Sequence, residues 1–121
     1  EQSLDKLGRL TGWTRGTMNA SCLNISDPVS QTTHLCSDEI INSRVGQGDR
    51  GGPIFIPPAP GAGTQPLYPV GILWGTDPSD LNVYDPGEGA WYCNGGAGAC
   101  IIYYSNWARI QTHMTSPFYP N

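Results

Sequence analysis

The sequence predicts an all-β fold, and three observations support this expectation. The chain of 121 residues contains 16 glycines and 11 prolines, whereas only 13% of its residues are charged. This composition favours many short strands joined by turns, because long helices would need more Ala, Glu, Lys and Leu. Short apolar runs separated by turn-forming residues follow one another along the chain. No internal repeat or linker interrupts them, so we expect a single domain over residues 1–121.

Four strands are expected in the first half of the chain. Residues 7–21 carry three glycines between polar and apolar residues, which indicates two short strands joined by a turn at 14–16. Residues 36–45 predict a third strand, which approaches a glycine-rich turn at 46–52. The apolar residues 54–56 follow that turn as a fourth strand.

Two further strands are expected in the second half. Residues 57–63 contain too many prolines to donate the hydrogen bonds of a central strand, so we expect a surface loop. The most apolar run, 67–74, predicts a buried strand, and residues 101–104 predict the last one. Between them, residues 76–99 are rich in Asp, Pro, Gly and Asn and indicate a long exposed excursion.

A short helix is expected near the C-terminal end. Trp107, Ile110 and Met114 fall on one helical face after Ser105, which is a suitable N-cap residue. Two prolines beyond Met114 stop the helix from extending further. The sequence thus predicts six strands and one helix.

Charge and hydropathy exclude two classes of partner. The formal net charge is −4, and no basic stripe is present that could follow a phosphate backbone, so we expect no nucleic-acid partner. No run of about 18 apolar residues is present, so we expect no membrane span. The N-terminal residues lack the basic and apolar segments of a signal peptide, and we expect a mature, processed piece.

The four cysteines form two pairs that are close in sequence, Cys22 with Cys36 and Cys93 with Cys100. Four cysteines allow three connectivities, of which we expect this local one. Neither pair has the C-x-x-C form of a zinc knuckle, and His34 is the sole hint of a metal, so we expect no metal or other cofactor. Two disulfides in a small chain indicate an oxidising compartment, and secretion follows naturally.

Two short patterns are candidate modification sites. Asn19 precedes Ala-Ser and Asn24 precedes Ile-Ser, which both match the N-glycosylation acceptor pattern. They become relevant if the protein is secreted from a eukaryotic cell.

The main candidate for a functional motif is the glycine-rich turn Gly48-Asp49-Arg50-Gly51-Gly52-Pro53. Such a glycine-rich path projects the third side chain outward and points backbone N–H groups into one hollow, where they can stabilise an oxyanion. It resembles the nucleophile turn of the trypsin and chymotrypsin family, Gly-Asp-Ser-Gly-Gly-Pro, at five of six places. Gly12-Trp13-Thr14 precedes it, and 71–75, 102–104 and the terminal helix follow in the order of that family.

The resemblance covers about residues 6–114 and corresponds to the second β-barrel of the family. It implies a six-stranded antiparallel Greek-key barrel of the chymotrypsin type with a short C-terminal helix. Gly51 and Gly52 would then be structural residues of the turn. The base and its orienting acid belong to the first barrel of the family, which this sequence does not contain. Neither His34 nor His113 lies in the sequence context of the base.

Arg50 is the departure that decides the implied function. It stands where the family has its serine, and a guanidinium is always protonated and cannot attack a carbonyl. No intact catalytic residue is therefore expected. The backbone N–H groups of Gly48 and Arg50 are candidates for an oxyanion hollow, which Arg50 itself could equally fill.

Asp49 matches the acid that commonly receives a newly freed amino terminus in the family. This chain begins Glu1-Gln2, and not with the apolar start of that mechanism. Asp49 is then more simply a turn residue that accepts local N–H groups, or a partner of Arg50 or Arg44.

Arg44, Trp74 and Gly75 are the candidates for a substrate pocket. Arg44 stands six residues before the nucleophile position, where it would give the pocket a cationic floor, although pairing with an acid at the core edge is the simpler interpretation. Trp74 and Gly75 match the edge that binds the substrate backbone, and burial alone would explain Trp74 equally well.

Three functions follow from these residues. The first is a catalytically inactive homologue of trypsin-like serine proteases that binds or assembles with protein, either a companion chain or copies of itself. The second is one chain of a processed, secreted serine endopeptidase whose first barrel lies on another polypeptide. The third is a disulfide-bonded β-module that binds carbohydrate through Trp91 and Tyr92.

Overall fold

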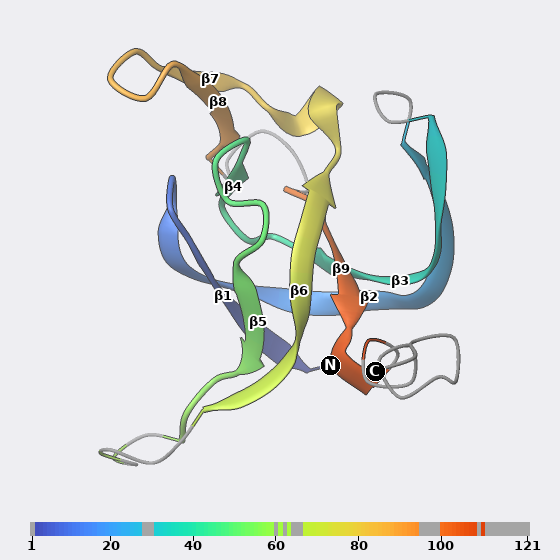
Figure 1. Cartoon of the computed structure of the whole chain (residues 1–121). Coiled ribbons are helices and arrows are strands. Elements are labelled where there is room, and N and C mark those ends of the chain that lie inside the picture. The colour runs from blue at the N-terminus through green and yellow to red at the C-terminus, as the bar shows by residue number, and fades with distance from the viewer. Residues whose placement is uncertain are drawn as a thin grey trace, which may run out of the picture.

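The protein is described by a computed structural model that covers residues 2–27, 31–59, 61, 63, 67–94, 100–108 and 110. Within this part the chain forms nine strands and a short 3₁₀ helix (Figure 1). Six strands build one antiparallel sheet in the order β1-β2-β3-β9-β6-β5, and the sheet closes in a ring because β1 also pairs with β5. Their bounds are β1 Ser3–Gly8, β2 Gly12–Asp27, β3 Thr32–Ile41, β5 Pro53–Ile56, β6 Tyr68–Thr76 and β9 Ile102–Asn106. The prediction of an all-β fold is confirmed.

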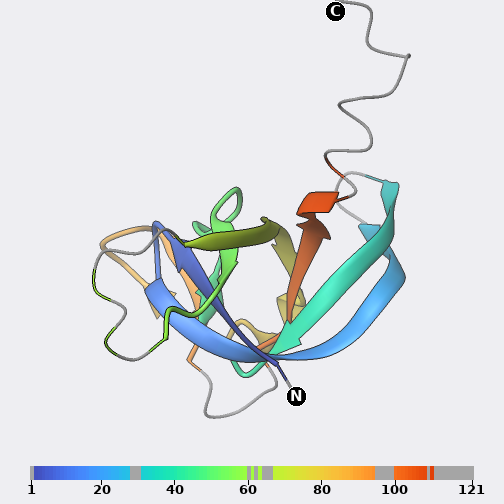
Figure 2. The same ribbon diagram turned by 90° about the horizontal axis from the view of Figure 1, so that it is seen from below.

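The ring of strands surrounds the apolar core. Figure 2 shows the blue, teal, orange, olive and green strands following one another around the sheet. The side chains that fill its interior are buried and mostly aliphatic, and Tyr104 is the largest of them. The Tyr104 hydroxyl meets the sulfur of Met18, 3.6 Å away, so that the buried phenol has a polar partner. The core cluster consists of Leu4, Ile40, Val45, Ile54, Leu73, Cys93, Cys100, Ile102 and Tyr104.

The first hairpin turns earlier than the sequence predicted. β1 and β2 pair in a register that sets Gly8 opposite Gly12, so the turn lies at residues 9–11 and the expected turn at 14–16 is wrong. Gly12 has a φ of +71°, which favours glycine and suits the end of the turn. Gly16 instead lies within β2, where a Cβ would come within 2.6 Å of the Ile40 side chain. Its role is therefore close packing against β3 and not chain reversal.

The region 76–99 contains more regular structure than the predicted excursion. Its described part holds the 3₁₀ helix η1 Pro78–Asp80 and two strands, β7 Val83–Asp85 and β8 Ala90–Cys93. β8 pairs with the short strand β4 Val45–Gly46, and the three strands form a second small sheet in the order β4-β8-β7. Cys93 and Ala90 are buried by this pairing, so the region is not wholly exposed.

β6 is also less buried than its composition suggested. Along the strand, Leu73 points into the core, whereas Ile72 is 39% exposed on the opposite face. The alternation follows from the pleat, because only one face of this sheet is covered by the rest of the chain.

The predicted C-terminal helix lies mostly outside the described residues. Trp107, Ala108 and Ile110 have helical backbone, and the remainder up to Met114 is not described. The predicted N-cap at Ser105 is wrong, because Ser105 belongs to β9. The Asn106 side chain instead accepts a hydrogen bond from the backbone N–H of Ala108 at 2.8 Å. An N-cap side chain forms this type of hydrogen bond, so Asn106 is the capping residue.

Both predicted disulfides are present. Cys22–Cys36 joins β2 to β3, and Cys93–Cys100 joins β8 to the chain just before β9. They indicate an oxidising, extracytoplasmic environment. Among the described residues no group of three or more His, Cys, Asp or Glu side chains is placed to hold a metal ion. No helix in the same part of the chain is long and apolar enough to cross a membrane.

Candidate functional site

The turn at 46–52 connects β4 to β5 and is held in place by the buried carboxylate of Asp49. One oxygen, Oδ1, accepts the backbone N–H groups of Leu10 at 2.8 Å and Thr11 at 3.0 Å. The other, Oδ2, accepts the backbone N–H of Gly46 at 2.9 Å and the hydroxyl of Thr11. Asp49 therefore fastens the turn both to its own first residue and to the tip of the β1–β2 hairpin.

A buried lysine completes this network. Lys6 Nζ lies 3.6 Å from Asp49 Oδ2, and it donates to the carbonyl of Gly12 at 2.9 Å and to the hydroxyl of Thr11. Both charged side chains are almost fully shielded from solvent, with exposed fractions of 1% and 0%. Burial lowers the pKa of Lys6, and the Asp49 carboxylate offsets part of that effect.

Burial and polar contacts also compete in setting the pKa of Asp49, but here the polar contacts prevail. Burial on its own raises the pKa of Asp49, but the hydroxyl and N–H of Thr11, the Lys6 ammonium and the Leu10 N–H together lower it below its ordinary value. The carboxylate is therefore ionised at neutral pH. An ionised acid with four hydrogen-bond donors is a fixed structural anchor.

Two glycines allow the turn to approach the hairpin this closely. A Cβ on Gly8 would overlap the Asp49 carboxylate, and a Cβ on Gly52 would overlap the backbone oxygen of Leu7. The turn is further tied to β6, because Gly51 N–H donates to the Leu73 carbonyl at 2.8 Å and Leu73 N–H donates back to Gly52 at 2.9 Å. These contacts fix the backbone on both sides of residue 50.

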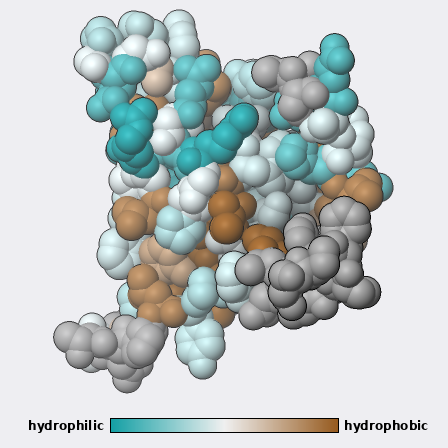
Figure 3. All heavy atoms as spheres, in the orientation of Figure 1, coloured by the Kyte–Doolittle hydropathy of each residue, from teal (hydrophilic) through white to brown (hydrophobic). Residues whose placement is uncertain are grey.

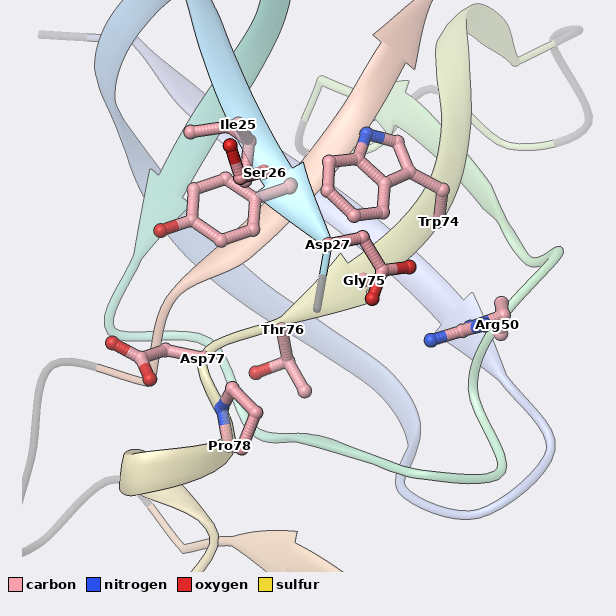
Figure 4. A pocket seen from close by; sticks show the side chains of 10 residues that line it. Ile25, Ser26, Asp27, Arg50, Trp74, Gly75, Thr76, Asp77 and Pro78 are labelled. Carbon is pink, nitrogen blue, oxygen red and sulfur yellow. The ribbon is translucent and has the colours of Figure 1, made fainter. Parts of the chain in front are cut away.

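Arg50 is an exposed residue of this rigid turn. Its side chain lines two adjacent cavities, with volumes of about 240 Å³ and about 350 Å³. Figure 4 shows Arg50 pointing from the turn into the first cavity, which the Asp27 carboxylate of β2 also faces. The residues shared by both cavities are Arg50, Gly75, Thr76 and Pro78. The two cavities thus meet at Arg50, along the end of β6.

An aromatic stack forms one wall of the smaller cavity. Trp74 and Tyr103 both line it, and their rings stack with centroids 5.5 Å apart. The His34 ring also stacks on Trp74, with ring centroids 3.7 Å apart, and the indole N–H of Trp74 donates to the Ser37 hydroxyl at 3.0 Å. Two stacked rings and one hydrogen bond at its edge therefore hold the indole in place in the cavity wall.

His34 is not paired with a nucleophile in the described part of the chain. Its Nε2 lies 3.9 Å from the Asp27 carboxylate, and no hydroxyl in that part forms a hydrogen bond with it. All four cysteines are in disulfides, so no described thiol is free. His113 lies outside the described residues. Among the described residues, His34 therefore has no hydroxyl or thiol partner that it could activate as a nucleophile.

The structure brings together some of the candidate pocket residues and separates others. Trp74 and Gly75 line the cavities beside Arg50. Arg44 lines neither of them, and its guanidinium instead lies over the Tyr92 ring at 5.7 Å from the centroid. The cation of this site is Arg50 itself, so the suggestion of a pocket floor at Arg44 is not supported by the placement of that side chain. The Asp49 side chain pairs with neither arginine, because Lys6 and the hairpin tip occupy it.

The backbone N–H groups of Gly48 and Arg50 donate no hydrogen bond within the described part of the chain. They are the two groups proposed from sequence for an oxyanion hollow. Next to Gly48 lies the Arg9 guanidinium, which forms an exposed ion pair with Glu88 at 2.6 Å. This end of the turn therefore presents N–H donors and no acidic group except the paired Glu88.

The remaining candidate residues lie away from the cavities. Trp91 is exposed and packs against Tyr84 with ring centroids 5.2 Å apart. Asn19 is exposed on β2 and donates to the Glu39 carboxylate at 2.6 Å. Asn24 is also exposed, and its side-chain oxygen accepts the N–H of Cys36 at 3.1 Å. These contacts leave both asparagines on the outer surface of the ribbon formed by β2 and β3.

Sequence reasoning missed the role of Lys6. A single lysine in the first strand gives no signal of burial by itself, because lysines are almost always exposed. The alternation along β1 was the available sign, since it places Lys6 on the same face as the apolar Leu4.

No known family model and no curated protein sequence matches this chain.

Proposed function

We propose that this chain is a catalytically inactive homologue of the trypsin-like serine proteases, which acts as a secreted subunit for binding or assembly with protein. The observation that carries the proposal is the exposed guanidinium of Arg50 at the nucleophile position of a rigid glycine-rich turn. A guanidinium has no acceptor lone pair and stays protonated at every physiological pH, so it cannot form an acyl intermediate.

The fold is consistent with this assignment. We interpret the closed six-strand sheet as the Greek-key barrel that forms the second half of a chymotrypsin-type protease. The turn lies between β4 and β5 and is hydrogen-bonded to β6, as a nucleophile turn must be to face a substrate that binds along a strand edge. The short terminal helix would begin after Asn106.

Binding to protein is supported by an apolar row on the outer face of the sheet. Leu7 and Trp13 are paired across β1 and β2, and Pro53 and Ile72 are paired across β5 and β6. All four side chains are exposed, with Trp13 at 56%. Lys6 is paired with Ile54 across β1 and β5, so the adjacent residues Leu7 and Pro53 lie side by side. The two pairs therefore form one row across the sheet.

This row begins beside the turn that carries Arg50. Figure 3 shows hydrophobic atoms gathered over the middle of the face on which β5 and β6 lie in Figure 1. Contiguous apolar surface of this kind favours association, because its burial removes apolar area from water. The partner is then a companion chain or a second copy of this chain.

Sedimentation velocity tests the assembly. At micromolar concentration and above, the purified chain should sediment as a concentration-dependent mixture of monomer and larger species, or as one complex when its companion is present. A strictly monomeric particle at all concentrations and with every candidate companion would contradict the proposal.

A second candidate function is a chain of a processed secreted endopeptidase, with the first barrel on another polypeptide. The same apolar row beside residue 50 favours it, since that is where a second barrel would complete an active site. The test is Arg50→Ser with the companion chain added. Covalent labelling of that serine by a fluorophosphonate supports this function, and no labelling in the assembled complex excludes it.

A further inference from the structure

We propose that Arg50 binds a peptide carboxylate whose neighbouring apolar side chain occupies the larger cavity. This inference names a ligand class for the proposed function. It rests on that function because Arg50 is assumed to hold the ligand without attacking it. The ligand carboxylate is either the C-terminus of a peptide or an Asp or Glu side chain.

The first support is that the Arg50 guanidinium has no ion pair within the described part of the chain. The other described cations are engaged. Arg15 contacts Asp5 at 2.7 Å, Arg9 contacts Glu88, Lys6 is buried against Asp49, and Arg44 lies over Tyr92. A guanidinium that faces two cavities and forms no ion pair with a described acid is available to an external carboxylate.

The second support is the lining of the larger cavity. Arg50 is the one charged residue among the described residues that line it, and Leu73, Leu81 and Pro78 give it apolar walls. The Gln47 side chain also lines it, with its oxygen already bound to the backbone N–H of Trp91 at 2.8 Å, so the amide group that remains is a donor. A cavity with a guanidinium, an amide donor and apolar walls favours an anion attached to an apolar group.

The third support is the backbone beside the guanidinium. The N–H groups of Gly48 and Arg50 are not used by the described chain, and they flank Asp49 in the same rigid turn. A carboxylate has two oxygens, and one can accept from the guanidinium while the other accepts from such N–H groups. The smaller cavity is the less suitable place for the anion, because Asp27 and Asp77 also line it.

The size of the larger cavity restricts the apolar group. A volume of about 350 Å³ is at the lower end of the range for small-molecule sites and accommodates one side chain and a carboxylate, but not a folded segment. A peptide that ends in leucine, or that carries Glu beside leucine, has the required chemistry.

The experiment measures binding of short peptides by isothermal titration calorimetry to the purified full chain. Acetyl-Ala-Ala-Leu is used with a free and with an amidated C-terminus, and acetyl-Ala-Glu-Leu-amide is compared with its Gln counterpart. Tighter binding of the free acid identifies a C-terminal carboxylate, whereas tighter binding of the Glu peptide identifies an acidic side chain. Equal affinity of all four peptides overturns the proposal.

Two variants assign the binding to Arg50. Arg50→Gln should weaken the preferred peptide about tenfold or more, because a charge-assisted hydrogen bond is lost. Arg44→Gln is the matched control, an exposed arginine outside both cavities, and should bind as the unmodified chain does. Unchanged binding in Arg50→Gln with a native near-ultraviolet circular dichroism spectrum contradicts the proposal, and Arg50→Lys tests the same point if the glutamine variant does not fold.

Mass spectrometry of the peptides after titration separates this inference from the proposed function. Intact peptides with Arg50-dependent binding support both. Cleaved peptides contradict the inactive assignment, whereas intact peptides without carboxylate preference contradict only the ligand assignment.

Discussion

The ammonium of Lys6 lies 3.6 Å from the carboxylate of Asp49 beneath the turn that carries Arg50. The two charges are buried together, and every oxygen of the carboxylate has hydrogen-bond donors from the hairpin tip or from the turn itself. This pair joins the first strand to the turn that carries Arg50. The conformation around residue 50 is therefore set by internal residues.

Lys6→Met should destabilise the protein strongly. The substitution keeps most of the side-chain volume but leaves the Asp49 charge buried without its cation, which costs about 3 kcal/mol or more. Urea unfolding followed by tryptophan fluorescence measures the loss. Arg9→Met is the matched control on the same hairpin, and it should leave the unfolding midpoint unchanged because the Arg9–Glu88 pair is exposed. Equal midpoints for Lys6→Met and the unmodified chain would show that the buried pair does not hold the turn.

Asp49 should make the fold sensitive to acid. Its pKa is lowered in the folded state, so its contribution to stability is present above its unfolded pKa of about 4 and is lost as the pH falls through the lower folded value. The free energy of unfolding, measured in urea at pH 7, 5 and 3, should decrease most between the last two. Asp49→Asn should be less stable at pH 7 and should lose less stability between pH 5 and pH 3. An identical acid dependence in the variant would contradict this assignment.

Gly52→Ala should disrupt the turn, whereas Gly75→Ala should not affect stability. A Cβ at residue 52 would overlap the Leu7 carbonyl oxygen, and backbone cannot move aside as a flexible side chain can. We expect a loss of about 3 kcal/mol from this overpacking. A Cβ at Gly75 meets no other atom within 4 Å. Thermal unfolding of the two variants provides the comparison, and similar midpoints would mean that the turn does not pack on the hairpin as described.

The apolar row should govern association. Replacing Leu7 and Ile72 together by serine should shift the sedimentation profile toward monomer, because both exposed side chains lie on the proposed contact face. Leu35→Ser is the control, since Leu35 is 72% exposed at the far part of the β2–β3 ribbon. If the control reduces association and the double variant does not, the contact face lies elsewhere.

Local patterns were sufficient for the all-β class, but they missed β7 and β8 and misplaced the first chain reversal. The runs 54–56 and 102–104 lie in strands, as expected for short continuous apolar segments bounded by turn-forming residues. The glycine at 16 was misassigned to a turn because sequence does not distinguish a glycine that reverses the chain from one that allows close packing against β3. That distinction depends on strand pairing, which is a property of the closed sheet.

In the candidate site, too, local sequence predicted some features, whereas others depend on long-range contacts. Residue 50 and its glycine neighbours were predicted as a candidate site from the glycine-rich turn and from its resemblance to the nucleophile turn of the trypsin and chymotrypsin family. The placement of Arg44 away from the cavities and the burial of Lys6 were not predictable, because each depends on contacts between residues more than 30 positions apart. The His34–Trp74 stack likewise joins β3 to β6, which are separated by β9 in the sheet.

The central claim is that residue 50 cannot act as a nucleophile, and a peptide-library cleavage assay tests it most directly. The purified chain is incubated with a mixed peptide library at pH 7 and the products are identified by mass spectrometry, with Arg50→Ala as the comparison. We predict that neither protein produces any cleavage product. Cleavage by the unmodified chain that disappears in Arg50→Ala would contradict the account.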